Sequence, residues 1–496
     1  MPQYVIDASL LDSFLPPPLL GEMTKSIDAP ARGRVLRLSS SYLAWFACGV
    51  PLALLLLASI LRSLNGHATV DLAIFDQGLW SASRGFGLHS SLIGGSLLED
   101  HFSPGLLLFV PLYLVSPSPI WLLVAQGAAI LVAVLALTSR LNRSGISRAA
   151  LVGASILVSP PIAYALLFDF HAAVLAAPFA LVALWALEDQ KVWPAALLGL
   201  AAAAFRLEVG VAVLLGFVAV PGPLRPRLRP ALVLAAYLAV AMFLDSRLGD
   251  VSYWVVHYSH LGTSPADAII HPVRLVESIF SIDTLKKGLP WLMSSAFIAL
   301  LRPRLLVPGL IAGLPVLLSE WPGTTSWFAH YGAVPTLLFS LAWVPALMQR
   351  KNLTKYVIAA NLTLAAVVGP FTPTAVPRAG GHGQSDVLAS LQETQAKCIV
   401  AGINPSAVVS ASQKPAALLA HRRSLYLWPY PFDGTPPDLL PIPTRRHGDA
   451  AQARNVDYII AEGSPPLPQD FVLEEEHGTY ARYARAGLAR PELNPC

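Results

Sequence analysis

Apolar runs separated by short polar turns repeat along most of the chain. Eleven of these runs are long enough, or nearly so, to cross a bilayer as a helix, since a perpendicular span needs about 20 residues. The shorter runs would have to be tilted, broken or extended into their flanks. The pattern predicts an all-α polytopic membrane bundle of about 11 spans. The runs are 42–61, 119–139, 149–167, 172–187, 192–205, 207–220, 230–245, 290–301, 305–319, 331–348 and 355–370.

Two longer polar stretches interrupt the apolar runs and predict outer segments of the membrane domain, residues 42–370. The first, 62–118, contains the apolar piece GLLLFVPLYLV at 105–115. This piece is too short to span, so we expect it to lie in the membrane interface or to re-enter the membrane. The second stretch, 246–289, carries aromatic side chains and three histidines.

The pattern changes to a Pro-rich, polar sequence at about residue 371. The short apolar runs SAVVSAS, RSLYLW and VDYIIAEG predict buried strands between turns, and 384–397 and 414–421 are helix candidates. Residues 371–496 are therefore expected to form a small soluble α/β domain.

Composition and the placement of charged residues predict that the chain lies in a membrane and how it is oriented there. The chain is 54% hydrophobic and 13% charged, whereas a soluble domain is about a quarter charged. With the N-terminus inside, sixteen Lys and Arg residues precede or join the spans on the inner side, against seven on the outer side. The positive-inside rule then predicts a cytoplasmic N-terminus, and an odd span count places the tail outside.

Both ends of the chain carry further expectations. Residues 1–41 are polar and Pro-rich, and we expect them to form a disordered cytoplasmic leader. A standard cleavable signal peptide is not expected, because the first apolar run begins too late for one. Cys398 and Cys496 lie in the tail and could pair if it is extracytoplasmic, although the sequence does not show that they are close.

Ionisable side chains stand in apolar surroundings at five turns of the predicted outer face. Such groups are costly at membrane depth, and they usually face a cavity and pair with one another. The five turns therefore predict a polar cavity in the outer leaflet. Its candidate residues are Asp71 and Asp76, Asp100 and His101, Asp169 and His171, Arg206 and Glu208, and His330 and Tyr331.

Each of these residues also has a simpler interpretation. A carboxylate beside a span end is most often only solvated, and Asp169 with His171 could form a structural hydrogen bond. Arg206 and Glu208 are two residues apart, so on one helix they would face different ways and be poor partners. The two carboxylates after the first span, Asp71 and Asp76, are five positions apart, so one could point into the cavity while the other caps or braces the fold.

The same residues carry a resemblance to a known family. DLAIFDQGLW, HFSP, FDFHAA, RLE and HYGAVP, followed in the tail by VVSAS, HRRSLYLWP and VDYIIAE, resemble an uncharacterised bacterial family of multi-spanning membrane proteins. That family is a domain of unknown function grouped with the GT-C glycosyltransferases, and the resemblance covers roughly 65–465. One turn departs from the family pattern Lys-Glu-Asp, because this chain has Arg206, Leu207 and Glu208 there.

The resemblance implies a GT-C-like bundle in the bacterial plasma membrane. It further implies a polyprenyl-phosphate-linked sugar as donor, usually inverting chemistry, and an acidic residue in the first outer loop. Asp71 matches that acid, and Asp76 is the next candidate. The expected partners are membrane lipid, the lipid-linked sugar and an extracytoplasmic acceptor, with no nucleic acid.

The chemistry of such a transfer suits these residue types. An inverting transfer needs one base for the acceptor hydroxyl, and Asp71 is the candidate. Arg206 is suited to bidentate contact with the leaving phosphate. Asp100 is the candidate ligand for a divalent cation, for which oxygen donors favour Mg²⁺ or Mn²⁺. The remaining candidates for substrate binding are Glu208, Asp169, His171, His101, His330 and Tyr331.

Two other classes of function remain open at this point. A transporter or flippase for a lipid-linked or anionic solute would use the same buried charges as a relay, with matched halves in the sequence. The acids instead cluster at outer span ends, and no matched halves are visible. A non-catalytic scaffold whose tail binds an envelope partner is the third interpretation.

Overall fold

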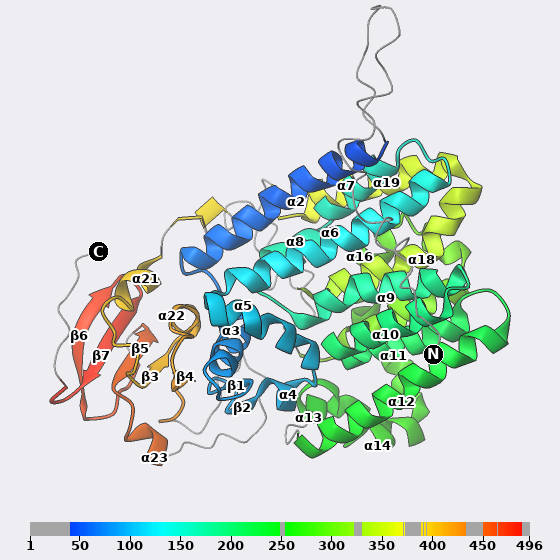
Figure 1. Cartoon of the computed structure of the whole chain (residues 1–496). Helices are drawn as coiled ribbons and strands as arrows, with labels where there is room; N and C mark the ends of the chain where they lie inside the picture. Colours follow the sequence, from blue (N-terminus) through cyan, green and yellow to red (C-terminus); the bar gives the residue numbers. More distant parts are fainter. Residues whose placement is uncertain are drawn as a thin grey trace, which may run out of the picture.

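The computed structural model describes residues 40–248, 253–321, 330–370, 372, 388–389, 391–392, 394–432, 450–463 and 465–488. Helices make up most of these residues, and a sheet lies near the C-terminal end (Figure 1). The predicted leader lies outside the described residues except for its last two positions.

Four helices of the described chain are long and apolar enough to cross a membrane: α2 (Ser40–Leu64), α6 (Ile120–Arg143), α12 (Leu224–Leu248) and α18 (Ala333–Gln349) with the preceding 3₁₀ turn η5 (His330–Gly332). A fifth candidate is the pair α7 (Ala149–Val158) and α8 (Pro160–Leu167), bent by 56°. The bend falls at Ser159, whose extended backbone precedes two prolines that lack an N–H for the helix ladder. The predicted count of 11 spans is therefore not confirmed.

Shorter helices occupy five further predicted runs. They are α9 (Ala172–Glu188), α10 (Val192–Phe205), α11 (Leu207–Ala219), α17 (Pro303–Leu318) and α19 (Thr354–Val368). Small residues let α10 and α11 approach closely, because a Cβ on Gly210 would lie 2.5 Å from the Ala203 Cβ. These helices lie at the predicted positions. Each has fewer than 18 residues, so they are not among the helices long enough to cross a membrane by themselves.

The predicted span at 290–301 is wrong. The helix α16 (Ile282–Met293) ends inside it, and the 3₁₀ turn η3 (Ile298–Leu301) follows. Between them Ala296 and Phe297 take positive φ values of 50° and 59°, which an L-residue in a helix does not adopt. The apolar composition of this run therefore reflects a packed turn rather than a continuous helix.

Short elements fill both predicted outer segments. The first contains α3 (Val70–Ser83), the two-residue strands β1 (His89–Ser90) and β2 (Gly95–Ser96), α4 (Leu97–Asp100), the 3₁₀ helix η1 (Pro104–Phe109) and α5 (Val110–Val115). The second contains α13 (Tyr253–Tyr258), η2 (Ser259–Leu261), α14 (Pro265–Ile270), α15 (Pro272–Ile279) and α16. The 3₁₀ turn η6 (Lys351–Leu353) joins α18 to α19.

The C-terminal region forms a five-stranded sheet with the order β4-β3-β5-β7-β6. The three predicted strands are confirmed as β3 (Val409–Ala411), β4 (Leu425–Leu427) and β5 (Tyr458–Glu462), and all three run parallel. The antiparallel hairpin β6 (Phe471–His477) and β7 (Tyr480–Arg485) was not predicted, because β6 reads FVLEEEH and exposes both apolar and charged residues.

Three short helices accompany the sheet. They are α21 (Gln395–Ile399), α22 (Gln413–Leu418) and α23 (Ala450–Ala453). The first overlaps only the end of the candidate 384–397, most of which lies outside the described residues. Cys398 is disulfide-bonded and Cys48 is free and buried, whereas Cys496 lies outside the described residues.

The C-terminal region packs against the end of the bundle where α2 finishes. The Thr394 backbone N–H donates to the Asn65 carbonyl at 3.0 Å, and the Leu425 N–H donates to the Ser91 hydroxyl at 2.8 Å. We call this end of the bundle the tail-side end and the opposite end the far end. Since α2 has 25 residues and spans about 37 Å, the chain enters the bundle at the far end (Figure 1).

Candidate functional site

The five predicted turns come together at the tail-side end of the bundle. They are the start of α3, the end of α4, the α8–α9 turn, the α10–α11 turn and η5. The Ser103 hydroxyl donates to the Phe205 carbonyl at 2.8 Å and so ties the segment after α4 to the end of α10. Gly105 lies beside the Phe205 ring, where a Cβ on this glycine would come within 2.9 Å of the ring. We call the gathered side chains the acidic–histidine cluster.

A row of four side chains forms the centre of this cluster. Asp71 lies in the first turn of α3, and its Oδ2 is 3.4 Å from Nε2 of His171. The His171 ring stacks on the His330 ring with centroids 3.1 Å apart, and His330 in turn contacts Tyr331. The Asp71 side chain keeps 31% of its surface exposed, so this carboxylate is both positioned and accessible.

Asp169 is a structural anchor for α3 rather than a side chain open to a ligand. It is buried, and its Oδ2 accepts hydrogen bonds from the N–H and hydroxyl of Thr69, both at 2.6 Å, and from the N–H of Leu72. These donors belong to the N-cap and first turn of α3, where an anion is favoured by the helix dipole. Asp169 therefore holds the helix that presents Asp71.

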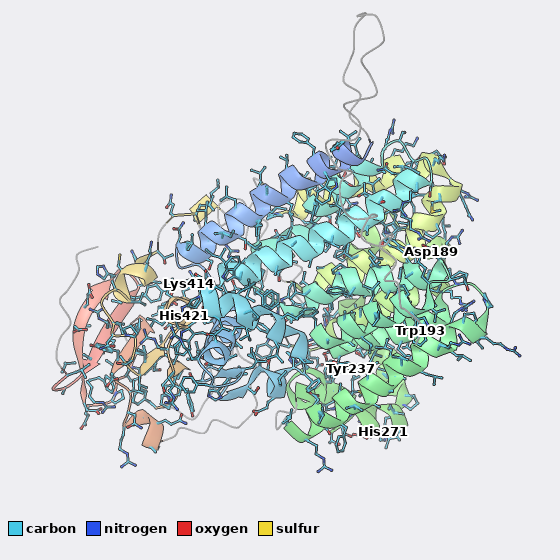
Figure 2. All side chains as sticks on the ribbon, in the orientation of Figure 1. Asp189, Trp193, Tyr237, His271, Lys414 and His421 are labelled. Atoms are coloured by element: carbon cyan, nitrogen blue, oxygen red, sulfur yellow. The ribbon has the colours of Figure 1, made fainter. Side chains whose placement is uncertain are left out.

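Asp76 points away from the row and towards the C-terminal region. Its carboxylate is buried and accepts from the Tyr113 hydroxyl at 2.7 Å, and the His421 Nε2 lies 3.0 Å from the same oxygen. The Trp80 ring stacks on His421 at an interplanar angle of 9°. Figure 2 shows His421 where the C-terminal region meets the helices. Asp76 thus braces the fold.

Arg206 and Glu208 form an ion pair, and the expectation that they are poor partners is wrong. The Arg206 Nε is 2.9 Å from a Glu208 oxygen. The expectation assumed one continuous helix, but Arg206 has extended backbone angles of φ −159° and ψ 119° between α10 and α11. This break turns both side chains to the same side of the turn.

Asp100 and His101 sit at the edge of the cluster with shifted protonation. Burial raises the pKa of Asp100 to about 7, with Arg206 opposing the shift and Asp71 adding to it. Burial also lowers the pKa of His101 well below its ordinary value, and the positive charge of Arg206 acts in the same direction. His101 is therefore neutral at pH 7, and both groups lie within the electrostatic range of Arg206.

Across the ranges that the structure describes, no three His, Cys, Asp or Glu side chains form a group that could hold a metal ion. Asp100, the predicted ligand, has the His101 Nε2 at 3.8 Å from its Oδ2. Dependence on Mg²⁺ or Mn²⁺ stays a prediction that a chelator can test.

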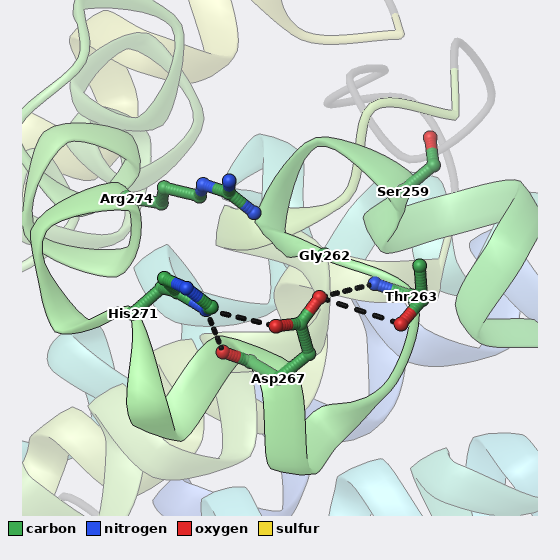
Figure 3. A pocket seen from close by; sticks show the side chains of 6 residues that line it. All are labelled: Ser259, Gly262, Thr263, Asp267, His271 and Arg274. Carbon is green, nitrogen blue, oxygen red and sulfur yellow. Dashed lines mark hydrogen bonds and ion pairs between the residues drawn. The ribbon is translucent and has the colours of Figure 1, made fainter.

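The second outer segment borders the cluster. Burial raises the pKa of Tyr258 to about 12, with Glu208 adding to the shift and Arg206 opposing it, so this phenol lies within the electrostatic range of the ion pair. A hollow of about 530 Å³ is lined by residues that follow Tyr258 in the sequence, between Ser259 and Arg274. Figure 3 shows its lining, in which Asp267 accepts from the Thr263 N–H and hydroxyl and pairs with His271.

Sequence reasoning missed three residues that complete this region: Tyr113, Tyr258 and His421. All three lie in segments that it had singled out, the interfacial piece, the second outer stretch and the tail motif HRRSLYLWP, but none of these patterns indicates a partner. The Asp76–His421 contact joins residues 345 positions apart, so no local signal could have found it.

The comparisons with known proteins place the chain in a family. The family described as predicted membrane protein (DUF2079) matches residues 61–479, and the chain belongs to it. The comparison with curated proteins found no match, and the comparison with solved structures found none either.

Proposed function

We propose that this member of the family is a GT-C-type membrane glycosyltransferase that moves a sugar from a polyprenyl-phosphate donor to an extracytoplasmic acceptor. The observation that carries the proposal is the accessible carboxylate of Asp71 among fixed polar groups. The two neighbouring acids, Asp76 and Asp169, are buried, and their carboxylate oxygens accept hydrogen bonds from other groups of the protein. Asp71 is thus the accessible carboxylate in the row with His171, His330 and Tyr331, whereas the partly exposed Glu208 is paired with Arg206.

Asp71 acts as the general base in this proposal. It takes the proton of the acceptor hydroxyl as that oxygen attacks the anomeric carbon. The bond from this carbon to the phosphate oxygen breaks, and the phosphate leaves with the electron pair. Because a phosphate is a good leaving group, no general acid is required. His171, 3.4 Å from Asp71, orients the carboxylate.

Arg206 stabilises the charge of the leaving phosphate. Its Nε is held by Glu208, which fixes the plane of the guanidinium and turns the Nη groups toward the phosphate. Neutral His101, together with the stacked His330 and Tyr331, lines the sugar site beside it. No step requires a metal ion.

The segment 104–115 meets the lipid chain of the donor. Its apolar side chains Leu107, Leu108, Leu114 and Val115 are exposed, whereas Tyr113 turns inward to Asp76. An exposed apolar face next to the cluster supports contact with an isoprenoid tail, because such faces mark lipid or partner contacts.

The test uses purified protein in nanodiscs with radiolabelled polyprenyl-phosphate hexoses and pentoses. We expect turnover in the wild type and a loss of at least about 100-fold in Asp71→Asn, the size typical of a removed general base. Asp283→Asn is the matched control, since Asp283 is an exposed acid on α16. An EDTA arm tests the metal prediction.

Each other outcome argues against part of the proposal. Wild-type turnover in Asp71→Asn would remove this residue from the mechanism. Failure of Asp71→Asn to insert or fold would make it structural. No turnover with any donor, together with stable binding of the lipid, would favour the transporter, flippase or scaffold alternatives.

A further inference from the structure

A group of arginines lies at the far end of the bundle, and among the described residues neither Arg227 nor Arg304 forms an ion pair with an acid. It lies where the α11–α12 loop meets the start of α17, opposite the acidic–histidine cluster. Only 5% of the Arg227 surface is exposed, and within the described chain its Nε has no hydrogen-bond partner.

Two guanidinium groups converge on one carbonyl oxygen. The Arg227 Nη1 donates to the Val218 carbonyl at 3.3 Å, and the exposed Arg304 donates to the same oxygen from its Nη2 at 2.8 Å. One neutral carbonyl therefore lies between two full positive charges. Like charges held this close repel, so the arrangement favours the arrival of an anion.

Helix dipoles add to this positive potential. Arg225, Arg227 and Arg229 fall in the first two turns of α12, and Arg304 falls in the first turn of α17. Neither helix has an acidic residue in its first turn. Cations at a helix N-terminus are unfavourable, whereas a phosphate there is stabilised by the unpaired N–H groups.

Two acids at the same end of the bundle form ion pairs with a different arginine, Arg140. Glu188 and Asp189, at the end of α9, both contact Arg140 of α6, and Figure 2 labels Asp189 at this end. The loop lies against the arginine, since a Cβ on Gly222 would be in ordinary van der Waals contact with the Arg227 Nη2, at 3.5 Å. The guanidinium is thus held in place under the loop.

Apolar side chains flank the arginines on the surface. Leu228 and Leu232 of α12 are exposed, as are Leu300 and Leu301 next to α17. A phosphate bound at the arginines would bring acyl chains over these leucines. Basic pockets between membrane helices bind anionic lipid headgroups in this manner.

We propose that Arg227 and Arg304 form a binding site for the phosphate headgroup of an anionic phospholipid in the leaflet at the far end. The site is independent of the proposed transferase, because it uses none of its residues. Arg227 supplies a buried, preoriented guanidinium, Arg304 closes the site from the surface, and the two helix N-termini complete the positive field.

The experiment measures lipid binding to the full chain in neutral detergent micelles. Phosphatidylglycerol is titrated against phosphatidylcholine while the fraction of protein carrying lipid is followed by native mass spectrometry. We expect preferential binding of phosphatidylglycerol, weakened about fivefold in Arg304→Gln and about 25-fold in Arg227→Gln/Arg304→Gln. Arg229→Gln is the control, since Arg229 is exposed on the same helix.

The outcomes that overturn the proposal are defined in advance. If Arg304→Gln binds phosphatidylglycerol as tightly as Arg229→Gln, the site does not hold the headgroup. If inorganic phosphate at millimolar concentration displaces the lipid from wild type and stabilises it equally well, the site takes a free anion instead. Should the buried change at Arg227 prevent folding, the exposed Arg304→Gln variant alone decides the question.

Discussion

Three aspartates within one region show how surroundings assign different tasks to the same side chain. Asp71 faces an accessible cluster and contacts an imidazole. Asp169 is buried against the N-terminus of a helix, and Asp76 is buried between a tyrosine and a histidine. A carboxylate that accepts several internal hydrogen bonds supports structure, whereas the one that keeps exposed oxygens can exchange protons with a ligand.

Removing the anchor of α3 should cost stability. In Asp169→Ala the N–H groups of Thr69 and Leu72 lose their acceptor, so we expect the free energy of unfolding to fall by about 3 kcal/mol, the size of a lost charged hydrogen bond. Thermal unfolding in detergent measures this change. Asp71→Ala serves as the comparison and should unfold near the wild-type temperature; equal midpoints for both variants would contradict the assignment.

The raised pKa of Asp100, about 7 in the folded protein, predicts a pH dependence of stability. The unfolded chain ionises this group near pH 4. As pH rises from 4 to 7 the unfolded state loses its proton first, so folding becomes less favourable over this window and changes no further above it.

Asp100→Asn should remove this part of the pH profile. Compared with wild type, the variant should gain thermal stability at pH 7.5 and show little difference at pH 4.5. Differential scanning fluorimetry at the two pH values gives the comparison. Parallel profiles for the two proteins would show that Asp100 is not held protonated by burial.

At the scale of elements, α3 connects the cluster to the C-terminal region. One side of the helix presents Asp71, and another presents Asp76 and Gln77, whose amide donates to the Arg422 carbonyl at 2.9 Å. Because α22 packs against α3, and the Leu425 N–H of β4 donates to Ser91 just after β1, we expect a shift of the C-terminal region to reach the helix that carries the proposed base.

The contact between His421 and Asp76 should stabilise this docking. His421→Ala leaves a buried carboxylate with the Tyr113 hydroxyl as its recorded donor, so we expect amide exchange in residues 413–427 to rise about tenfold. Hydrogen exchange with mass spectrometry follows these peptides. The exposed His89→Ala variant should exchange like wild type, and unchanged exchange in His421→Ala would rule out the docking role.

At the scale of the whole molecule, the first helix and the C-terminal sheet define opposite ends. The N-terminus of α2 lies at the far end, and the sheet packs on the tail-side end. An odd number of crossings would produce this arrangement, in which the arginine group and the acidic–histidine cluster lie at opposite ends of the bundle.

Cysteine labelling tests this topology in intact cells. Ser406→Cys, in the exposed turn before β3, should react with a membrane-impermeant maleimide, whereas Arg225→Cys at the far end should react only after permeabilisation. Background labelling is low because Cys48 is buried and Cys398 is disulfide-bonded. The reverse pattern would show an inverted orientation, and labelling of both from outside would refute the odd crossing number.

Local patterns in the sequence predicted the class of the protein, the helices in ten of the eleven apolar runs and three strands of the tail. These features follow from local periodicity, since an apolar run of a given length has few ways to bury itself. The sequence also indicated which turns carry ionisable groups. The family model confirms the membership that the motifs indicate, and the transferase activity is a proposal.

Tertiary structure alone decided which acid is accessible, that Arg206 and Glu208 pair, and that run 290–301 breaks at a turn. It also brought His421 to Asp76 across 345 residues and two guanidinium groups to the Val218 carbonyl. Hydrogen bonds and ion pairs depend on distances of a few ångströms and on backbone direction at single residues. Neither is encoded in hydrophobic periodicity, because chain segments far apart in sequence set both through their packing.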